Sequence, residues 1–141
     1  MKTNLKRGVE GLESAENYLE TILVLGQNGA PVRSIDIAKE LDFAKPSVSV
    51  AMKNLRESGH ITVQGGLITL TESGRIIAET MYERHVFISG WLIALGVDKE
   101  TAHQDACKME HAMSEKSFSA IKQHIENFNK SFNNGSEHEK L

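Results

Sequence analysis

Three residues in the second half of the chain carry side chains that bind transition metals, at a spacing that suits a helix. They are Cys107, Glu110 and His111. Positions i, i+3 and i+4 of a helix project from one face, so a thiolate, a carboxylate and an imidazole would lie within reach of one divalent ion. Each residue taken alone is more often a buried or solvated side chain than a ligand. The combination and its spacing therefore carry the prediction of a metal site.

The bulk composition is that of a globular chain in a reducing compartment. Of the 141 residues, 40% are hydrophobic and 25% are charged, which is ordinary for such a chain. A single cysteine excludes an internal disulfide and fits the cytosol. No apolar run approaches the roughly 18 residues that a membrane-spanning helix needs, and the polar N-terminus does not resemble a secretion signal. We therefore expect a cytoplasmic protein with no membrane partner.

The net charge of −3 is unevenly distributed along the chain. Residues 1–70 contain eight basic and eight acidic side chains, whereas residues 71–141 contain eight basic and eleven acidic ones. A neutral half can still bind DNA where its cations cluster, as Lys45, Lys53 and Arg56 do. The acidic excess of the second half suits cation binding, although a solvated surface would give the same composition.

Helical periodicity and helix-ending residues predict three helices in the first half. Residues 15–25 carry apolar side chains at a helical period, and the glycines and proline of residues 26–31 end that helix. Ser34 is the predicted cap of a short second helix. Pro46 suits the first position of a third helix, and Gly59 suits its C-terminal end.

Two short β-rich segments follow the third helix. They cover residues 61–63 and 67–70, and Gln64, Gly65 and Gly66 join them in the manner of a hairpin. Helix, helix, turn, helix and hairpin in this order make up a winged helix-turn-helix. The predicted fold class is therefore mainly α with a small β-hairpin, in which a winged helix-turn-helix precedes an α-helical domain.

The second half is predicted to be helical throughout. Thr71 is the predicted cap of a long fourth helix that runs to about Leu95, and its apolar residues cover more than one face, as a connecting and dimerising helix requires. A fifth helix from about Asp98 to Ala112 carries the three candidate ligands, and a sixth begins near Ser114. The predicted divisions are a flexible leader (1–13), a DNA-binding domain (14–72), a metal-binding and dimerisation domain (73–128) and a disordered tail (129–141).

In a helix-turn-helix, the N-terminal end of the second helix of the unit lies at base edges in the major groove. Lysine and serine side chains there can meet phosphates or bases, and Pro46 and Val50 can touch thymine methyl groups. No arginine or glutamine stands at this helix tip, so we expect DNA shape and dimer spacing to contribute to specificity. The alternative is a helix that only packs in a bundle. The predicted DNA-binding residues are Ser34, Lys45, Pro46, Ser47, Ser49, Val50 and Lys53.

Five short segments, in order along the chain, carry a resemblance to a known family. They are ENYLETI (16–22), KPSVS (45–49), LTESG (70–74), ERH (83–85) and DACKMEH (105–111). Through them the chain resembles the metal-dependent repressors of the DtxR/MntR type over about residues 14–125. The resemblance implies a homodimeric repressor, not an enzyme, that binds palindromic double-stranded operators near metal-uptake genes. It also implies divalent iron or manganese as corepressor.

The resemblance further implies two metal sites in each subunit. Carried over by position, the ligands are Asn17, Cys107, Glu110 and His111 for the primary site, and Glu20, His85 and His103 for a second site that can share Glu110.

This sequence departs from both branches of the family. The manganese branch usually has an aspartate where Asn17 stands and a glutamate where Cys107 stands. The iron branch has the cysteine but usually a methionine in place of Asn17, and a glutamate where this chain has Ser89. It also carries a third, SH3-like domain that is not expected in these 141 residues.

The thiolate bears on the choice of metal, because it favours iron, cobalt, nickel or zinc over manganese. Iron(II) is therefore our first expectation and manganese(II) the second, with Zn²⁺, Co²⁺ or Ni²⁺ able to substitute. One alternative is a winged-helix regulator that responds to an organic effector or to oxidation of Cys107. Another is a small metalloenzyme, for which the sequence offers no separate general base.

Overall fold

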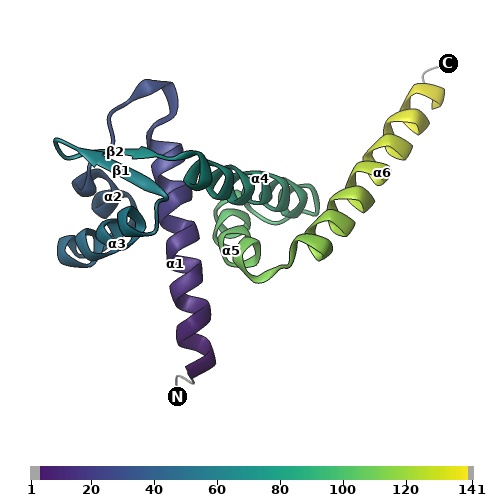
Figure 1. Ribbon diagram of the computed structural model, residues 1–141. Helices are drawn as coiled ribbons and strands as arrows, with labels where there is room; N and C mark the ends of the chain where they lie inside the picture. Colours follow the sequence, from purple (N-terminus) through teal and green to yellow (C-terminus); the bar gives the residue numbers. More distant parts are fainter. Residues whose placement is uncertain (1–3, 140–141) are drawn as a thin grey trace. The chain divides into compact units, whose positions relative to one another are not determined.

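The computed structural model describes the backbone of residues 4–139 and the side chains of residues 14–131. The described backbone is helical except for one antiparallel hairpin and its connections (Figure 1). The predicted fold class, mainly α with a small β-hairpin, is confirmed. The elements are α1 (Asn4–Leu25), η1 (Gln27–Gly29), α2 (Ser34–Leu41), α3 (Lys45–Glu57), β1 (Ile61–Gln64), β2 (Leu67–Leu70), α4 (Glu72–Ala94), α5 (Lys99–Ala112) and α6 (Glu115–Glu139).

The chain divides into two compact units, Met1–Glu83 and Arg84–Leu141. The terminal helices extend into segments that the sequence assigned to a leader and a tail, since α1 begins at Asn4 and α6 ends at Glu139. Helix was not predicted in these two segments because both contain glycine, which lowers helix propensity. The side chains of residues 1–13 and 132–141 lie outside the described part, so flexibility of the leader and disorder of the tail stay predictions.

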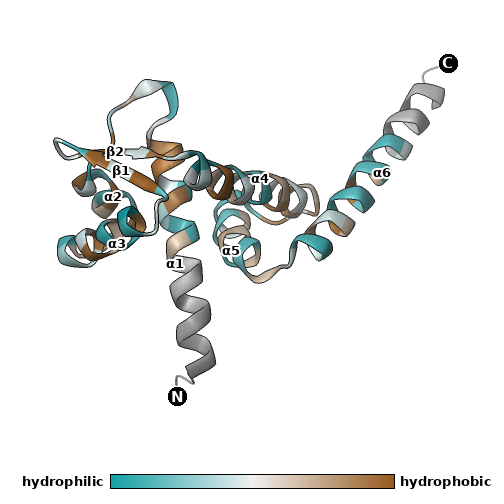
Figure 2. Ribbon diagram, in the orientation of Figure 1, coloured by the Kyte–Doolittle hydropathy of each residue, from teal (hydrophilic) through white to brown (hydrophobic). Residues whose placement is uncertain are grey.

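In the first unit, α1, α2 and α3 pack around one apolar core with the hairpin at its side (Figure 1). Figure 2 shows apolar residues on the strands and on parts of the helices in this unit. Each of the three helices contributes buried side chains to this core, including residues from the periodic segment 15–25. Among the buried members are Tyr18, Leu19, Ile22, Ile37, Ala38, Val48, Met52 and Leu55.

The start of α2 differs from the prediction by one residue. Arg33 occupies the N-cap position with an extended backbone (φ −123°, ψ 161°), and Ser34 is the first helical residue. The backbone N–H of Arg33 donates to Asp36 Oδ2 at 2.9 Å, so an acidic side chain three residues into the helix closes this end. The prediction that Ser34 caps the helix was therefore wrong.

The turn between α2 and α3 and the end of α3 follow backbone requirements visible in the sequence. Asp42 ends α2 in the left-handed region (φ 55°), which short polar side chains tolerate. Pro46 stands in the first turn of α3, one residue later than predicted, where its missing N–H costs nothing. Gly59, at φ 83°, follows the C-cap of α3 as predicted.

The hairpin is confirmed with a two-residue turn. Gln64 pairs with Leu67, and Gly65 and Gly66 both adopt positive φ (57° and 80°), as a type I′ turn requires. A further backbone bond runs from the N–H of Ile68 to the carbonyl of Val32 at 2.9 Å. The segment before α2 therefore lies against β2 and extends the hairpin by one interaction.

The helix starts predicted for the second half are confirmed by their caps. Thr71 Oγ1 accepts from the Gly74 N–H at 3.3 Å, and Asp98 Oδ2 accepts from the Thr101 N–H at 3.0 Å. Ser114 Oγ does the same for α6, accepting from the backbone N–H of the third residue after it at 3.1 Å. A smaller core of Ile88, Ala106 and Phe118 joins α4, α5 and α6 in the second unit. Across residues 4–139, no helix is long and apolar enough to cross a bilayer.

Candidate metal centre and DNA-binding surface

The three candidate ligands on α5 come together as their spacing predicts. One ligand atom from each of Cys107, Glu110 and His111 lies within 4.8 Å of the other two. Glu110 is fully buried (0% exposed), the His111 side chain is 3% exposed, and Cys107 is half-buried. This group of a sulfur, an oxygen and a nitrogen donor is named the α5 cluster below. Its donor set fits a divalent transition metal.

The Glu110 carboxylate is the centre of the polar contacts around the α5 cluster. His85 Nδ1, from α4, lies 3.0 Å from Glu110 Oε2, and His111 Nε2 lies 3.4 Å from Glu110 Oε1. A carboxylate removed from water requires compensating positive charge or hydrogen bonds. A bound cation or a protonated imidazole would supply that charge, so the arrangement is suited to exchange protons for a metal ion.

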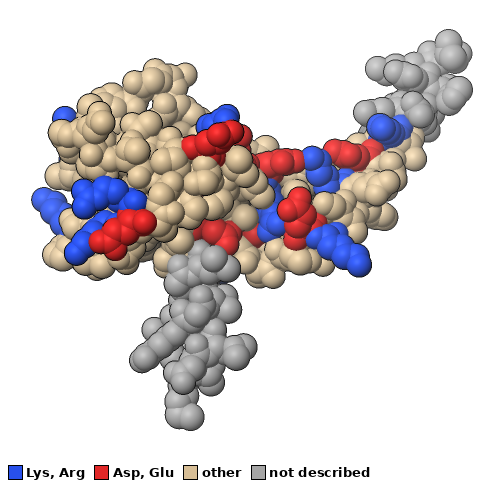
Figure 3. Space-filling model, viewed as in Figure 1, with Lys and Arg blue, Asp and Glu red and all other residues tan. Residues whose placement is uncertain are grey.

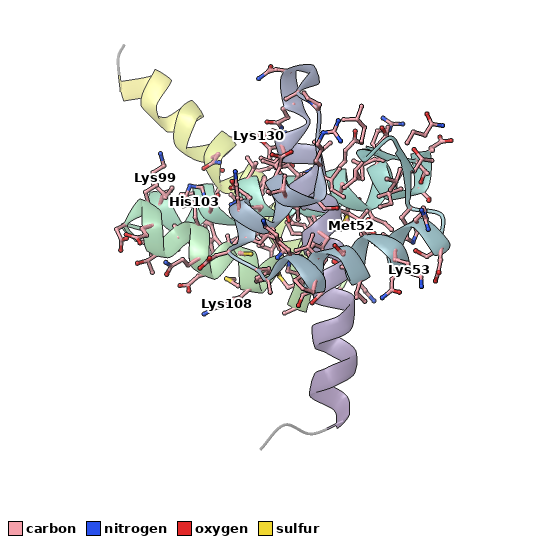
Figure 4. The ribbon with its side chains drawn as sticks, turned by 90° about the vertical axis from the view of Figure 1, so that its left-hand side faces the viewer. Met52, Lys53, Lys99, His103, Lys108 and Lys130 are labelled. Atoms are coloured by element: carbon pink, nitrogen blue, oxygen red, sulfur yellow. The ribbon has the colours of Figure 1, made fainter. Side chains whose placement is uncertain are left out.

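His85 also contacts His103, the other histidine that the resemblance assigns to a second site. His85 Nε2 lies 3.0 Å from His103 Nδ1. The ring planes differ by 17° and the centroids are 5.2 Å apart, so the rings meet edge to edge through these nitrogens. In Figure 4, His103 and Lys99 lie on one side of α5 and Lys108 on the other. The contacts thus form a row from Glu110 through His85 to His103.

The remaining residues of the predicted sites are placed as follows. Asn17 and Glu20 lie on α1 in the first unit, where they line a hollow of about 140 Å³ together with Glu40. Their role as ligands stays a prediction. Ser89, which stands where the iron branch has a glutamate, is buried and its hydroxyl donates to the Val86 carbonyl at 3.3 Å. Its hydroxyl is therefore engaged with its own helix.

One residue that the sequence reasoning missed supports the α5 cluster. Arg84 is buried, and its Nη1 donates to the carbonyls of Glu110 (2.9 Å) and Met113 (2.7 Å). Its guanidinium carbon also lies 5.3 Å from the centre of the Phe118 ring, within the range of a cation–π interaction. The partners lie 26 to 34 positions along the chain, so no local pattern could have identified this role.

The predicted DNA-binding residues lie on α2 and α3, and all but one of them are exposed. Ser34 is half-buried at the start of α2, and those of α3 are all exposed, with Val50 at 59%. Figure 3 shows Lys and Arg side chains gathered over the region labelled α2 and α3 in Figure 1, and Figure 4 shows Lys53 at this surface. A hollow of about 250 Å³ lies there, lined by Ser34, Ser49, Met52, Lys53, Arg56 and Val63.

Two family models cover most of the chain. The N-terminal DNA binding domain of the iron dependent repressors matches residues 12–66, and their metal binding and dimerisation domain matches residues 71–137. The chain belongs to the DtxR/MntR family. The two matched domains correspond to the two functions that the sequence predicted for the first and second halves.

Relatives agree with membership of the DtxR/MntR family. An uncharacterized HTH-type transcriptional regulator of Methanocaldococcus jannaschii is 34% identical over 119 residues, which cover 82% of this chain and 95% of the relative. The transcriptional regulator MntR of Escherichia coli O6:H1 is 31% identical over 129 residues, covering 84% and 83%. A solved structure of a manganese-dependent transcriptional repressor complex with manganese is 27% identical, with a TM-score of 0.72, over 79% of this chain. This chain spans about half of that structure (52%).

As a member of the DtxR/MntR family, the chain is a metal-dependent transcriptional repressor and not an enzyme. Its matched domains support DNA and a second copy of the chain as partners. The predictions of a winged helix-turn-helix, metal dependence and repression are therefore confirmed.

Proposed function

We propose that the physiological corepressor is iron(II), with manganese(II) as the second candidate. The observation that carries this proposal is the sulfur of Cys107 within 4.8 Å of the carboxylate of Glu110 and the imidazole of His111. A thiolate ligand favours iron over manganese, whereas a site of oxygen and nitrogen donors alone suits manganese. The names of the matched models refer to iron and one similar structure is a complex with manganese, so both metals are carried as candidates.

The primary site is proposed to consist of the α5 cluster and Asn17 of α1. A bound ion would supply a positive charge at the buried Glu110 carboxylate and a fixed coordination geometry. His111 and Cys107 deliver their donors from adjacent turns of α5. A second site is proposed at Glu20, His85 and His103, with Glu110 as a shared ligand.

The proposed switch follows from the elements that carry the ligands. Asn17 and Glu20 belong to α1 of the DNA-binding unit, whereas the other ligands belong to α4 and α5. Ligands from both units on shared ions would fix the distance between the two α3 helices of a dimer. Without metal, the carboxylates repel each other and the units are not held together. A coupling of about 1–3 kcal/mol between metal and DNA corresponds to about 5- to 150-fold regulation.

The proposed operator is palindromic and lies near genes of metal uptake. Two copies of α3, related by the two-fold axis of a homodimer, would read two half-sites in successive major grooves. Seven residues are proposed to contact the DNA. Those proposed at phosphates alone are Ser34 and Lys53, and those proposed at base edges or phosphates are Lys45, Pro46, Ser47, Ser49 and Val50.

The proposed dimer face is an apolar groove between α4 and α6, called the α4–α6 groove. It has a volume of about 490 Å³, and two of its side chains, Leu95 and Phe128, are each 65% exposed. An exposed apolar surface of this kind marks an interaction site. A second copy is the proposed occupant, because the matched dimerisation domain (residues 71–137) includes all the residues that line the groove. The lining includes Val86, Phe87, Gly90, Trp91, Leu95 and Phe128.

The test is DNA binding measured by anaerobic fluorescence anisotropy with iron(II), manganese(II), zinc(II) or a chelator. The DNA is a duplex that the metal-loaded wild-type protein selects from a random pool. We expect metal to tighten binding at least about fivefold in the wild type and to have no effect on His111→Ala. Gln123→Ala, an exposed change on α6 outside the lining of the α4–α6 groove, is the control and keeps the gain.

The outcomes separate the candidate functions. A larger gain with iron(II) than with manganese(II) at equal free concentration supports iron, and the reverse order supports manganese. Equally tight binding in the presence of chelator contradicts metal-gated repression. Regulation by an organic effector or by oxidation of Cys107 would then replace it.

A further inference from the structure

The β1–β2 hairpin is the wing of the winged helix-turn-helix, and Arg33 attaches it to the start of α2. Arg33 was not among the predicted DNA contacts. Arg33 Nη1 donates to the carbonyl of Gly65, at the tip of the hairpin, at 3.0 Å. This bond joins residues 32 positions apart, and it is exposed to solvent. It therefore fixes the wing from the side of the helix-turn-helix.

The close approach of Arg33 to the turn is visible in the neighbouring glycine. A Cβ atom added at Gly66 would lie 2.5 Å from Arg33 Nη1. Gly66 has φ 80° and its neighbour Gly65 has φ 57°, so the turn already requires glycine for its backbone. The guanidinium thus occupies space beside the turn that a side chain would fill.

Backbone contacts on both sides of Arg33 hold it in this place. The carbonyl of Val32 accepts from the Ile68 N–H at 2.9 Å, and the N–H of Arg33 donates to Asp36 Oδ2 at 2.9 Å. The residue is therefore tied to β2 on one side and to the first turn of α2 on the other. The backbone of Arg33 is therefore already ordered and loses little freedom when the side chain binds a ligand.

The guanidinium has donors to spare after it has bound the wing. Arginine carries five N–H groups in a planar fork, and one of the Arg33 groups is directed at Gly65. The rest of this exposed fork carries a full positive charge and is able to take a phosphate in a bidentate manner. The next residue, Ser34, lines the hollow that Lys53 and Arg56 also line, so Arg33 stands beside the basic surface already described.

We propose that Arg33 is a DNA-contact residue that binds a backbone phosphate while it holds the tip of the wing. The phosphate contact and the contact to Gly65 use different N–H groups of one fork, so the wing and the phosphate are positioned together. The inference depends on DNA binding by the first unit and not on the identity of the metal.

The test compares Arg33→Gln, Arg33→Lys and the control Lys39→Gln. Lys39 is an exposed cation in the last turn of α2, at the other end of this helix from Arg33, so its loss removes the same charge and leaves the Arg33–Gly65 bond in place. Binding is measured at several salt concentrations to the selected duplex and to a random duplex of about 30 base pairs, with metal at saturation. Thermal unfolding by circular dichroism checks that each variant is folded.

We expect Arg33→Gln to bind the selected duplex about tenfold more weakly. The slope of log K against log salt is negative, and its magnitude should fall by about 0.9, the value for one phosphate contact. Arg33→Lys keeps the slope but binds more weakly than the wild type, because an ammonium group cannot bridge wing and phosphate as a fork does. Lys39→Gln changes the slope by clearly less.

Two results would overturn the proposal. One is an unchanged salt slope in a folded Arg33→Gln protein, which leaves no phosphate contact to assign. The other is an equal fall in the magnitude of the salt slope in Lys39→Gln. The effect would then come from the net charge of the protein and not from a specific contact of Arg33. Failure of metal to affect any variant would contradict the proposed switch but would leave these salt slopes interpretable.

Discussion

Arg84 Nη1 lies 2.9 Å from the carbonyl oxygen of Glu110, so a buried cation on α4 holds the backbone of the residue whose carboxylate lies in the α5 cluster. The last carbonyls of a helix have no partner within the helix. Arg84 supplies one for Glu110 and one for Met113, at the C-cap of α5. The position of the candidate ligand Glu110 therefore depends on a side chain that does not itself offer a donor to a metal.

Replacing Arg84 is expected to weaken metal binding without removing a ligand. Arg84→Met should lower the affinity for cobalt(II) or iron(II) by about 10- to 100-fold, the range for residues that orient ligands. Competition against a chromophoric chelator measures this affinity under anaerobic conditions. Arg84→Lys retains the charge and should recover part of the loss.

The control for this prediction is Arg75→Met, on the same helix. Arg75 forms an exposed ion pair with Glu79 at 3.4 Å, of a kind that contributes little to stability. Its replacement should leave metal affinity unchanged. If folded Arg84→Met and Arg75→Met bind metal equally well, the carbonyl contacts of Arg84 have no bearing on the α5 cluster.

The sulfur of Cys107 should decide the preference among metals. Cys107→Asp replaces a soft donor by a hard one, so the affinity for manganese(II) relative to cobalt(II) or iron(II) should rise by at least about tenfold. In the wild type, cobalt(II) should produce a thiolate-to-metal absorption band, which Cys107→Ser and Cys107→Asp lose. A cobalt-loaded wild type without that band would show that the sulfur is not a ligand.

Asp98, the cap of α5, predicts a pH dependence of stability. The N–H and the hydroxyl of Thr101 hold the pKa of the Asp98 carboxyl below its ordinary value, with the backbone bond as the larger cause. A pKa that is lower in the folded state means that the cap stabilises the fold above the ordinary aspartate pKa, and that this stabilisation is lost as pH falls through the folded value. Asp98→Ala should therefore lower the unfolding temperature at neutral pH.

The difference between wild type and Asp98→Ala should disappear in strongly acidic solution. Asp98→Asn keeps an oxygen that accepts the Thr101 N–H, so its unfolding temperature should vary less with pH than that of the wild type. Thermal unfolding followed at neutral and at acidic pH measures both. A constant difference between wild type and Asp98→Ala at all pH values would mean that the charge of Asp98 is not involved.

Local signals in the sequence were sufficient for much of the fold. Caps at Thr71, Asp98 and Ser114 and the Gly65-Gly66 turn are short-range features, because a side chain or a backbone angle acts within three residues of its own position. The cap of α2 was mispredicted for the same reason. The oxygen that accepts the Arg33 N–H at this helix end belongs to Asp36, inside the helix. A rule that searches for a serine before the helix does not consider that residue.

The candidate metal centre was predictable to the extent that its ligands share one helix. Cys107, Glu110 and His111 required only the helical period. The contacts of Arg84 with Glu110 and of Arg33 with Gly65 join residues 26 and 32 positions apart. Such contacts arise from tertiary packing, and no spacing rule within one sequence identifies them.

The α4–α6 groove gives the last prediction, which concerns dimerisation. Replacing Leu95 and Phe128 together by aspartate places two charges on the proposed dimer face, where both side chains are now 65% exposed. Burial of one such apolar side chain contributes about 1.5–3 kcal/mol, so the dimer dissociation constant should rise by more than about tenfold. Sedimentation velocity over a range of protein concentrations measures this change.

The double variant should lose operator affinity while it keeps the metal affinity of the α5 cluster, since neither substituted residue is a candidate ligand. A palindromic operator requires two recognition helices at a fixed spacing, which a monomer cannot present. Glu126→Ala, an exposed change on α6 outside the groove lining, is the control and should remain dimeric. If the double variant sediments like the wild type and binds the operator equally well, the subunits meet through another face.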